Sequence, residues 1–274
     1  MPEFASILPM LLLLLAIGAF AGVVAGLLGV GGGIILVPAF YFALSGLGYN
    51  SPNLMQISLA TSLATIVFTS IRSVLSHHKK GAVDWEILKR WSVGIGLGAV
   101  AGMLATKGLR SEFLMMVFGV IGLIIGLYLA FGRPEWRLGL AMPAGIARGV
   151  VSPTIGFLSV LMGIGGGSFG VPLMSLYSVP IHRAVATSAG FGVIIAAPSV
   201  IGFLLTGTPV EGRPPFMVGQ VNIAAFITVI SMTLLTAPIG VKLAHSMNPK
   251  PLKRVFAFFI MVMALNMLRK ALLA

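Results

Sequence analysis

The sequence predicts an all-α polytopic membrane protein of about ten transmembrane helices, arranged as two inverted five-helix repeats whose second helices are short and broken by glycine. Three observations predict this fold class. Hydrophobic residues make up 58% of the 274 residues, and charged residues only 9%. Apolar stretches long enough to cross a bilayer recur along the chain. The motifs of the first half also return in the same order in the second half.

The composition excludes several classes of protein. A soluble domain carries roughly 25% charged residues, so neither a soluble enzyme nor a disordered chain fits. The chain has no cysteine, which excludes a disulfide-stabilised secreted domain. A net charge of +12 would indicate nucleic acid in a soluble protein, but Lys and Arg gather in the cytoplasmic loops of membrane proteins. We therefore expect the lipid bilayer, and no nucleic acid, as a partner.

Five apolar stretches in the first half predict its helices. A helix needs roughly 20 apolar residues to cross the hydrocarbon core, and four of the stretches approach this length. The shorter one follows the first glycine run. The expected helices are Ser6–Leu28, Ile34–Leu47, Met55–Leu75, Leu88–Ala105 and Phe113–Phe131. A cleaved signal peptide is the alternative for the first stretch, but the segment before it contains Glu3 and neither Lys nor Arg, which disfavours cleavage.

The second half shows the same order of long and short stretches. The expected helices are Leu140–Met162, Ser168–Val179, Ala184–Leu205, Val218–Ala244 and Val255–Leu268. We expect one repeat over residues 1–132, another over residues 139–274, and a connecting loop at 133–138. Whether the two short second helices cross the whole membrane stays open.

Repeated motifs predict that the two halves arose by duplication. The run Gly29–Gly33 returns 134 positions on as Gly163–Gly167, and each run has a proline five residues after its end. Ala60-Thr61-Ser62 returns 126 positions on, and Gly81-x-Val83-Asp84 returns 138 positions on as Gly219-x-Val221-Asn222. Since the order is the same in both halves, only two differences in loop length separate the copies.

The placement of charge predicts the orientation of the halves. The most basic segments are Arg72–Arg90 and Lys242–Arg254. If every predicted helix crosses the membrane, both segments lie on one side. If each short helix is a re-entrant hairpin, they face opposite sides. The positive-inside rule favours the first arrangement, which makes the five-helix repeats inverted and puts both termini outside.

The two glycine runs are the main candidates for a binding site. Glycine is a poor residue for a helix interior, and broken backbone at membrane depth persists only inside protein or beside a water-filled cavity. A helix that begins at such a break directs unpaired N–H groups into it and binds anions. Close helix packing is the alternative. The candidate substrate-binding residues are Gly31, Gly32, Gly33, Gly165, Gly166, Gly167 and Ser168.

Hydroxyl groups and two arginines complete the set of candidate substrate-binding residues. The hydroxyls occur at equivalent places near the start of each third helix, at Thr61, Ser62, Thr187 and Ser188. Such hydroxyls also bond back to their own helix, which is the alternative role. Arg183 precedes the second hydroxyl pair and Arg148 lies near the start of the sixth helix. Each arginine either attracts an anion or extends toward the membrane surface.

The acidic residues indicate the sign of the substrate by their positions. All six lie in predicted loops or at helix ends, whereas carboxylates inside spans mark many cation sites and proton relays. This distribution favours an anionic substrate. His77 and His78 adjoin Lys79 and Lys80 in an expected solvated loop, so we expect neither a metal site nor a cofactor. Protease or transferase motifs are also missing, which predicts that the protein is not an enzyme.

At these residues the chain resembles the TauE/SafE family of sulfite exporters. The matching motifs are Gly26-x-x-Gly29-Val30-Gly31-Gly32-Gly33, Gly163-Ile164-Gly165-Gly166-Gly167 and His182-Arg183-Ala184-x-Ala186-Thr187-Ser188. The resemblance implies a multi-pass secondary transporter of the plasma membrane, in bacteria the inner membrane. It also implies export of sulfite or related organosulfonates by alternating access. A coupling ion, proton or sodium, is left open, as are a passive anion channel and a non-transporting assembly or regulatory subunit.

Overall fold

The computed structural model describes residues 4–28, 32–132, 136–207, 212–246 and 250–273. Ten α-helices and one two-stranded hairpin make up this part of the chain. In the first half the helices are α1 (Phe4–Leu28), α2 (Gly33–Gly46), α3 (Leu54–His78), α4 (Trp85–Thr106) and α5 (Ser111–Phe131). In the second half they are α6 (Gly145–Leu161), α7 (Gly167–Leu176), α8 (Ile181–Leu204), α9 (Ile223–Ser246) and α10 (Lys250–Leu273).

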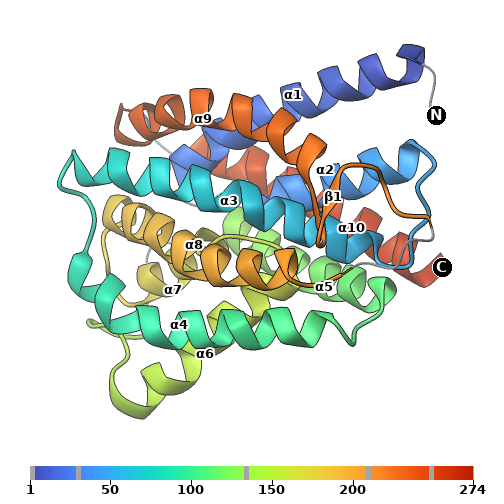
Figure 1. Ribbon diagram of the computed structural model, residues 1–274. Helices are drawn as coiled ribbons and strands as arrows, with labels where there is room; N and C mark the ends of the chain where they lie inside the picture. The colour runs from blue at the N-terminus through green and yellow to red at the C-terminus, as the bar shows by residue number, and fades with distance from the viewer. Residues whose placement is uncertain (1–3, 29–31, 133–135, 208–211, 247–249, 274) are drawn as a thin grey trace.

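The helices run roughly along one direction, and their lengths fit a membrane protein. Among the described residues, α3, α4, α5, α8 and α9 are long and apolar enough to cross a bilayer, while α2 and α7 are shorter apolar helices. The start of α1 and the end of α10 lie at one end of the molecule, and the α3–α4 connection, the end of α9 and the start of α10 lie at the other (Figure 1). The two most basic segments therefore share one end, as the ten-helix arrangement predicts.

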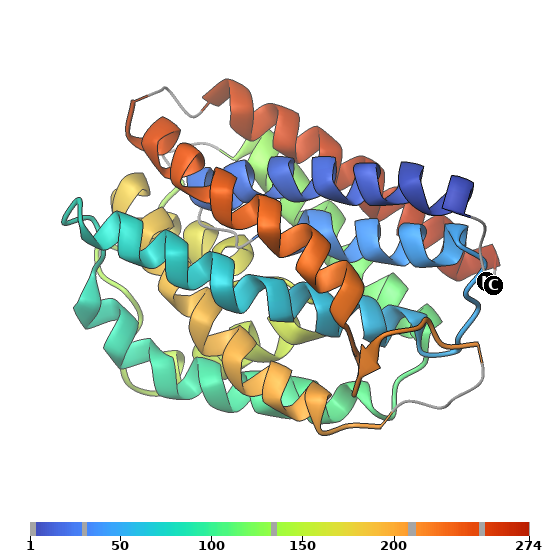
Figure 2. The same ribbon diagram turned by 45° about the horizontal axis from the view of Figure 1, so that its top comes forward.

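Helices at equivalent positions in the two halves make equivalent contacts. Helix α1 packs against α9, and its counterpart α6 packs against α4. Helices α3 and α8 pack against each other at the centre, as do α5 and α10 at one side. Figure 2 shows that α3 and α8 run in opposite directions, as inverted copies require. The first and fourth helices thus pair across the halves, so the two halves interlock.

Glycine allows this pairing across the halves. A β-carbon on Gly98 in α4 would strike the carbonyl oxygen of Pro153 in α6, and one on Gly26 in α1 would strike that of Ala237 in α9. Gly94 and Gly102, four residues to either side of Gly98, also face α6, so this glycine row packs α4 against α6. Small residues let helix backbones approach closely, and dispersion contacts then hold the helices together.

The predicted boundaries of α6, α9 and α10 were wrong. Helix α6 begins at Gly145 and not at Leu140, because Pro143 lacks an N–H and Gly145 is left-handed with φ +55°. Helix α9 begins at Ile223 and not at Val218, because β1 (Met217–Val218) pairs with β2 (Val221–Asn222) around the left-handed Gly219. Helix α10 extends beyond both ends of the predicted span.

The expected solvated loop at His77 was also wrong. Helix α3 continues to His78, and the His77 side chain is only 1% exposed. Its Nε2 lies 3.3 Å from the carbonyl oxygen of Gly26 in α1. His77 and His78 precede two lysines, so their polarity suggested a loop at a place where α3 continues and contacts α1.

Candidate functional site

The two glycine runs meet inside the protein. A β-carbon built on Gly33 would lie 2.6 Å from the carbonyl oxygen of Gly163 and 2.8 Å from the α-carbon of Ile164. Gly32 and Gly163 are left-handed, with φ +77° and +61°, so each chain turns at its run. Gly31 lies outside the described residues. The breaks of the two halves are therefore in direct contact.

A helix begins at each break without help from a side chain. Gly32 precedes α2 and Gly166 precedes α7, and neither helix has a side-chain N-cap. Gly165, Gly166 and Gly167 are all buried. The first N–H groups of a helix carry a partial positive charge, which an anion offsets. Two such helix ends inside a membrane protein are suited to hold a small anion.

The start of α7 is surrounded by serine hydroxyls. Ser168 and Ser188 are at most 3% exposed, and their hydroxyls have no hydrogen-bond partner among the described residues. The Ser188 hydroxyl lies 2.7 Å from the β-carbon position of Gly170, in the first turn of α7. The sequence analysis named both serines, and the structure brings them to the same helix end.

Ser70 of α3 belongs to the same group, and the sequence analysis missed it. Its hydroxyl is buried and has no partner among the described residues. The Ser70 hydroxyl and the backbone nitrogen of Gly166 both lie within 4 Å of the β-carbon position of Gly192 in α8. The residue 126 positions after Ser70 is Ala196, so a search for repeated residues does not find this serine.

The other predicted hydroxyls hold the two halves together. Ser62 donates to the carbonyl oxygen of Gly163 at 2.8 Å. Thr61 accepts from the backbone N–H of Asn222 at 3.0 Å and donates to Ile57 at 2.7 Å. Thr187 accepts from the backbone N–H of Asp84 at 2.9 Å. Apart from the Thr61–Ile57 bond within α3, these bonds join α3 or α8 to a segment of the opposite repeat.

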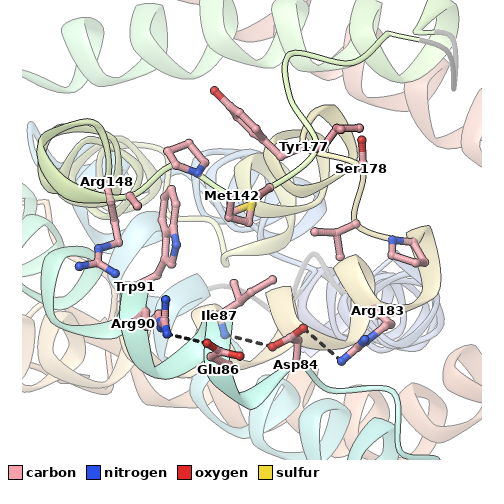
Figure 3. A pocket seen from close by; sticks show the side chains of 16 residues that line it. Asp84, Glu86, Ile87, Arg90, Trp91, Met142, Arg148, Tyr177, Ser178 and Arg183 are labelled. Carbon is pink, nitrogen blue, oxygen red and sulfur yellow. Dashed lines mark hydrogen bonds and ion pairs between the residues drawn. The ribbon is translucent and has the colours of Figure 1, made fainter.

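The two predicted arginines line a separate cleft. It has a volume of about 390 Å³ and lies between α4, the start of α6 and the α7–α8 connection (Figure 3). Arg183 pairs with Asp84 at 3.1 Å, while Arg148 stands in the first turns of α6. No glycine of the described runs lines this cleft. The arginines therefore lie at the end that carries the basic loops and not beside the glycine breaks.

The same cleft also holds Arg90, which ends one of the two basic segments and is not among the predicted substrate-binding residues. Arg90 pairs with Glu86 at 2.6 Å within α4. Three arginines and two carboxylates thus share the cleft, which leaves an excess of positive charge. In the part of the chain that the structure describes, no group of three or more His, Asp or Glu residues is placed to hold a metal ion.

Comparisons with known proteins agree with the architecture. The family model described as "Sulfite exporter TauE/SafE" matches residues 14–267. A "Probable membrane transporter protein" of Haemophilus influenzae is 30% identical, with 95% of this chain and 98% of that protein covered. Another of that description, MJ0441 of Methanocaldococcus jannaschii, is 27% identical, with 97% of both chains covered. A third, YunE of Bacillus subtilis, is 32% identical over 64% of this chain and 71% of that protein. No solved structure shows a significant match.

Proposed function

The chain belongs to the sulfite exporter TauE/SafE family of membrane proteins, and from this premise we propose that it is a secondary transporter that exports a small anion. Sulfite or a related organosulfonate is the proposed substrate, because the family description names sulfite. The plasma membrane, in bacteria the inner membrane, is the location that a multi-pass transporter of this kind occupies.

One observation carries the proposal for an anion. The two glycine breaks touch each other at the contact between the repeats, and each break begins a helix that no side chain caps. Both helix ends direct partial positive charge into a region from which side-chain carboxylates are missing among the described buried residues. A small oxyanion supplies the negative charge and the acceptor oxygens that such helix ends require.

Alternating access follows from the way in which the repeats are joined. The breaks place non-helical backbone where helices of opposite repeats meet, so a tilt of one repeat against the other changes the surroundings of a bound anion. The proposed binding region is the place where the two breaks meet, and Ser168 and Ser188 lie beside the second break. Ser62, Thr61 and Thr187 lie at the joints between the repeats. Arg148 and Arg183 attract the anion toward the cleft at the basic end.

Efflux from proteoliposomes loaded with sulfite, an organosulfonate or sulfate tests this function. A β-carbon on Gly166 would strike Phe191 and lie 2.8 Å from the carbonyl oxygen of Ser188, so Gly166→Leu should lower efflux at least about tenfold. Gly149→Leu is the matched control, because nothing lies within 4 Å of its β-carbon position on α6. Size-exclusion profiles and thermal unfolding show whether both variants fold.

The alternatives give different results in the same vesicles. A passive channel releases anion only down its gradient, whereas a coupled carrier also moves it against one when a proton or sodium gradient is applied. A non-transporting subunit shows no flux for any of the three anions. Equal efflux through Gly166→Leu and wild-type protein would reject the glycine breaks as the transport site.

A further inference from the structure

The two breaks have different surroundings, although the duplication relates them. Ser168 follows the second break, and its counterpart 134 positions earlier is Ile34. Gly192 lies beside the second break, and its counterpart 126 positions earlier is Ile66. Ile34 and Ile66 are at most 1% exposed, and Ile66 Cδ1 lies 2.6 Å from the β-carbon position of Gly33. Buried isoleucines therefore stand where the second break has a serine and a glycine, and one of them lies against the first residue of α2.

At the places that the duplication relates to these serines, the hydroxyls of the described residues already have partners. Ser62, the counterpart of Ser188, donates to the carbonyl oxygen of Gly163. Ser199 of α8, the counterpart of Ser73, donates to the carbonyl oxygen of Ile195 at 2.8 Å. At the place equivalent to Ser70 the chain has Ala196, which carries no polar group. Nothing in this set leaves a donor free for a ligand.

The hydroxyls around the second break are buried and free. Ser70, Ser168 and Ser188 have no hydrogen-bond partner among the described residues. An unsatisfied buried polar group costs about 1–3 kcal/mol, and native proteins keep few of them. Several such hydroxyls at one uncapped helix end therefore indicate a ligand that bonds to them.

We propose that the chain binds one substrate anion, at the second break only, with Ser70, Ser168 and Ser188 as its hydroxyl ligands. This inference rests on the proposed transport of an anion. The ligand is a small oxyanion such as sulfite or the sulfonate group of a larger molecule. Its oxygens accept hydrogen bonds from the serines and from the first N–H groups of α7. The first break carries no anion and serves as a dry contact between the repeats.

The position of Ser70 connects this site to alternating access. Ser168 and Ser188 come from α7 and α8 of the second repeat, whereas Ser70 comes from α3 of the first repeat. Helices α3 and α8 are packed side by side at the centre of the molecule (Figure 2). A movement of the repeats against each other therefore changes the distance of Ser70 from the other two hydroxyls. Loss of this third ligand weakens binding and releases the anion.

Binding and efflux of sulfite by purified protein test the proposal. Replacing Ser70, Ser168 or Ser188 by alanine should raise the Kd for sulfite about tenfold each, since each variant removes one hydrogen bond to a charged ligand. Ser199→Ala is the matched control, because this serine is also buried but donates to a carbonyl oxygen of its own helix. The control should keep the wild-type Kd. Calorimetric titration should give one sulfite per chain.

The outcomes separate this inference from the proposed function. Two equivalent sulfites per chain, no measurable sulfite binding, or an unchanged Kd in all three serine variants would overturn the inference, while efflux of an anion would still support transport. Binding that depends on the three serines, without any efflux, would support the inference and reject the transport function. If an alanine variant fails to fold, Ser→Thr at the same position replaces it in the test. Threonine keeps the hydroxyl, so its Kd for sulfite should stay closer to the wild-type value than the about tenfold increase expected for loss of the hydroxyl.

Discussion

Two loops at opposite ends of the molecule make the same contacts and differ in charge. The backbone N–H of Asp84, before α4, donates to Thr187, and that of Asn222, before α9, donates to Thr61. Asp84 and Asn222 each accept a hydrogen bond from the backbone N–H three residues on, at 3.1 and 2.9 Å, and so begin their helices. In each loop a left-handed glycine, Gly81 or Gly219, lies three residues before that side chain.

The surroundings of the two side chains account for the difference. Asn222 is 3% exposed, and its amide group donates to the carbonyl oxygen of Pro215 at 3.0 Å. Asp84 is more exposed and pairs with Arg183, whose counterpart 126 positions earlier is the apolar Ile57. The duplication thus keeps the backbone contact at both ends. Charge occurs at the end that carries the arginine cleft, where water and mobile ions stabilise it.

Exchanging the two side chains should have the largest effect. Asn222→Asp places a buried carboxylate against the Pro215 carbonyl oxygen without a cation, and we expect a loss of about 3 kcal/mol or more in the free energy of unfolding. Asp84→Asn keeps the cap of α4 and removes a partly exposed ion pair, so its loss should stay within about 1 kcal/mol. Unfolding of the purified protein in detergent measures both changes.

A pH series provides the control for this exchange. Burial raises the pKa of the introduced carboxyl, so the penalty is present above that pKa and decreases as the pH falls and the group becomes neutral. The wild-type protein and Asp84→Asn do not carry the introduced carboxyl, so their free energy of unfolding should not recover in this way as the pH falls. Equal losses for the two variants at neutral pH would mean that the two loops lie in equivalent surroundings.

Removing the shared contact should have a smaller and more symmetrical effect. Thr61→Val and Thr187→Val each leave a buried backbone N–H without its acceptor, and each should lower the free energy of unfolding by about 1–3 kcal/mol. Thr65→Val is the matched control, because its hydroxyl donates to the carbonyl oxygen of Thr61 within α3. Thermal unfolding measures the loss of stability in each of the three variants. A loss confined to one end would show that only that loop depends on its threonine.

The sequence predicts the helices well because their apolar stretches are long. It places their ends less well, because hydropathy continues through residues where the backbone stops a helix. Val218 is apolar but precedes the left-handed Gly219, and Leu140 is apolar but precedes Pro143. In both cases turn residues, and not polarity, set the helix start.

The candidate site was predicted in part, for a reason that the duplication makes clear. Repetition marks residues that both halves need, such as Thr61 and Thr187, which seat a loop of the opposite repeat. A comparison of the two halves for repeated residues does not find residues that only one half needs. Ser70 is one of these residues. The contact between the two breaks is also a property of the packed helices, since 130 residues separate Gly33 from Gly163.

The smallest expected effect on stability concerns the ion pair between Arg183 and Asp84. Their side chains are 51% and 20% exposed, so Arg183→Gln should cost less than about 1 kcal/mol in the free energy of unfolding. The charge at the cleft should still matter for the arrival of anions. We expect Arg183→Gln to lower the initial efflux rate about two- to threefold at low ionic strength. The difference should vanish at about 1 M salt, where the screening length is near 3 Å.

Arg90→Gln separates attraction by charge from a contact that joins the repeats. Arg90 lines the same cleft, but its partner Glu86 lies on the same helix, whereas Asp84 and Arg183 lie on opposite repeats. If the cleft acts through its charge alone, both variants should slow efflux equally and lose the effect in salt. If the Asp84–Arg183 pair also holds the basic end closed, only Arg183→Gln should keep an altered rate at high salt. That result would show that the charged loop at Asp84 differs from the uncharged loop at Asn222 in its effect on transport as well as on stability.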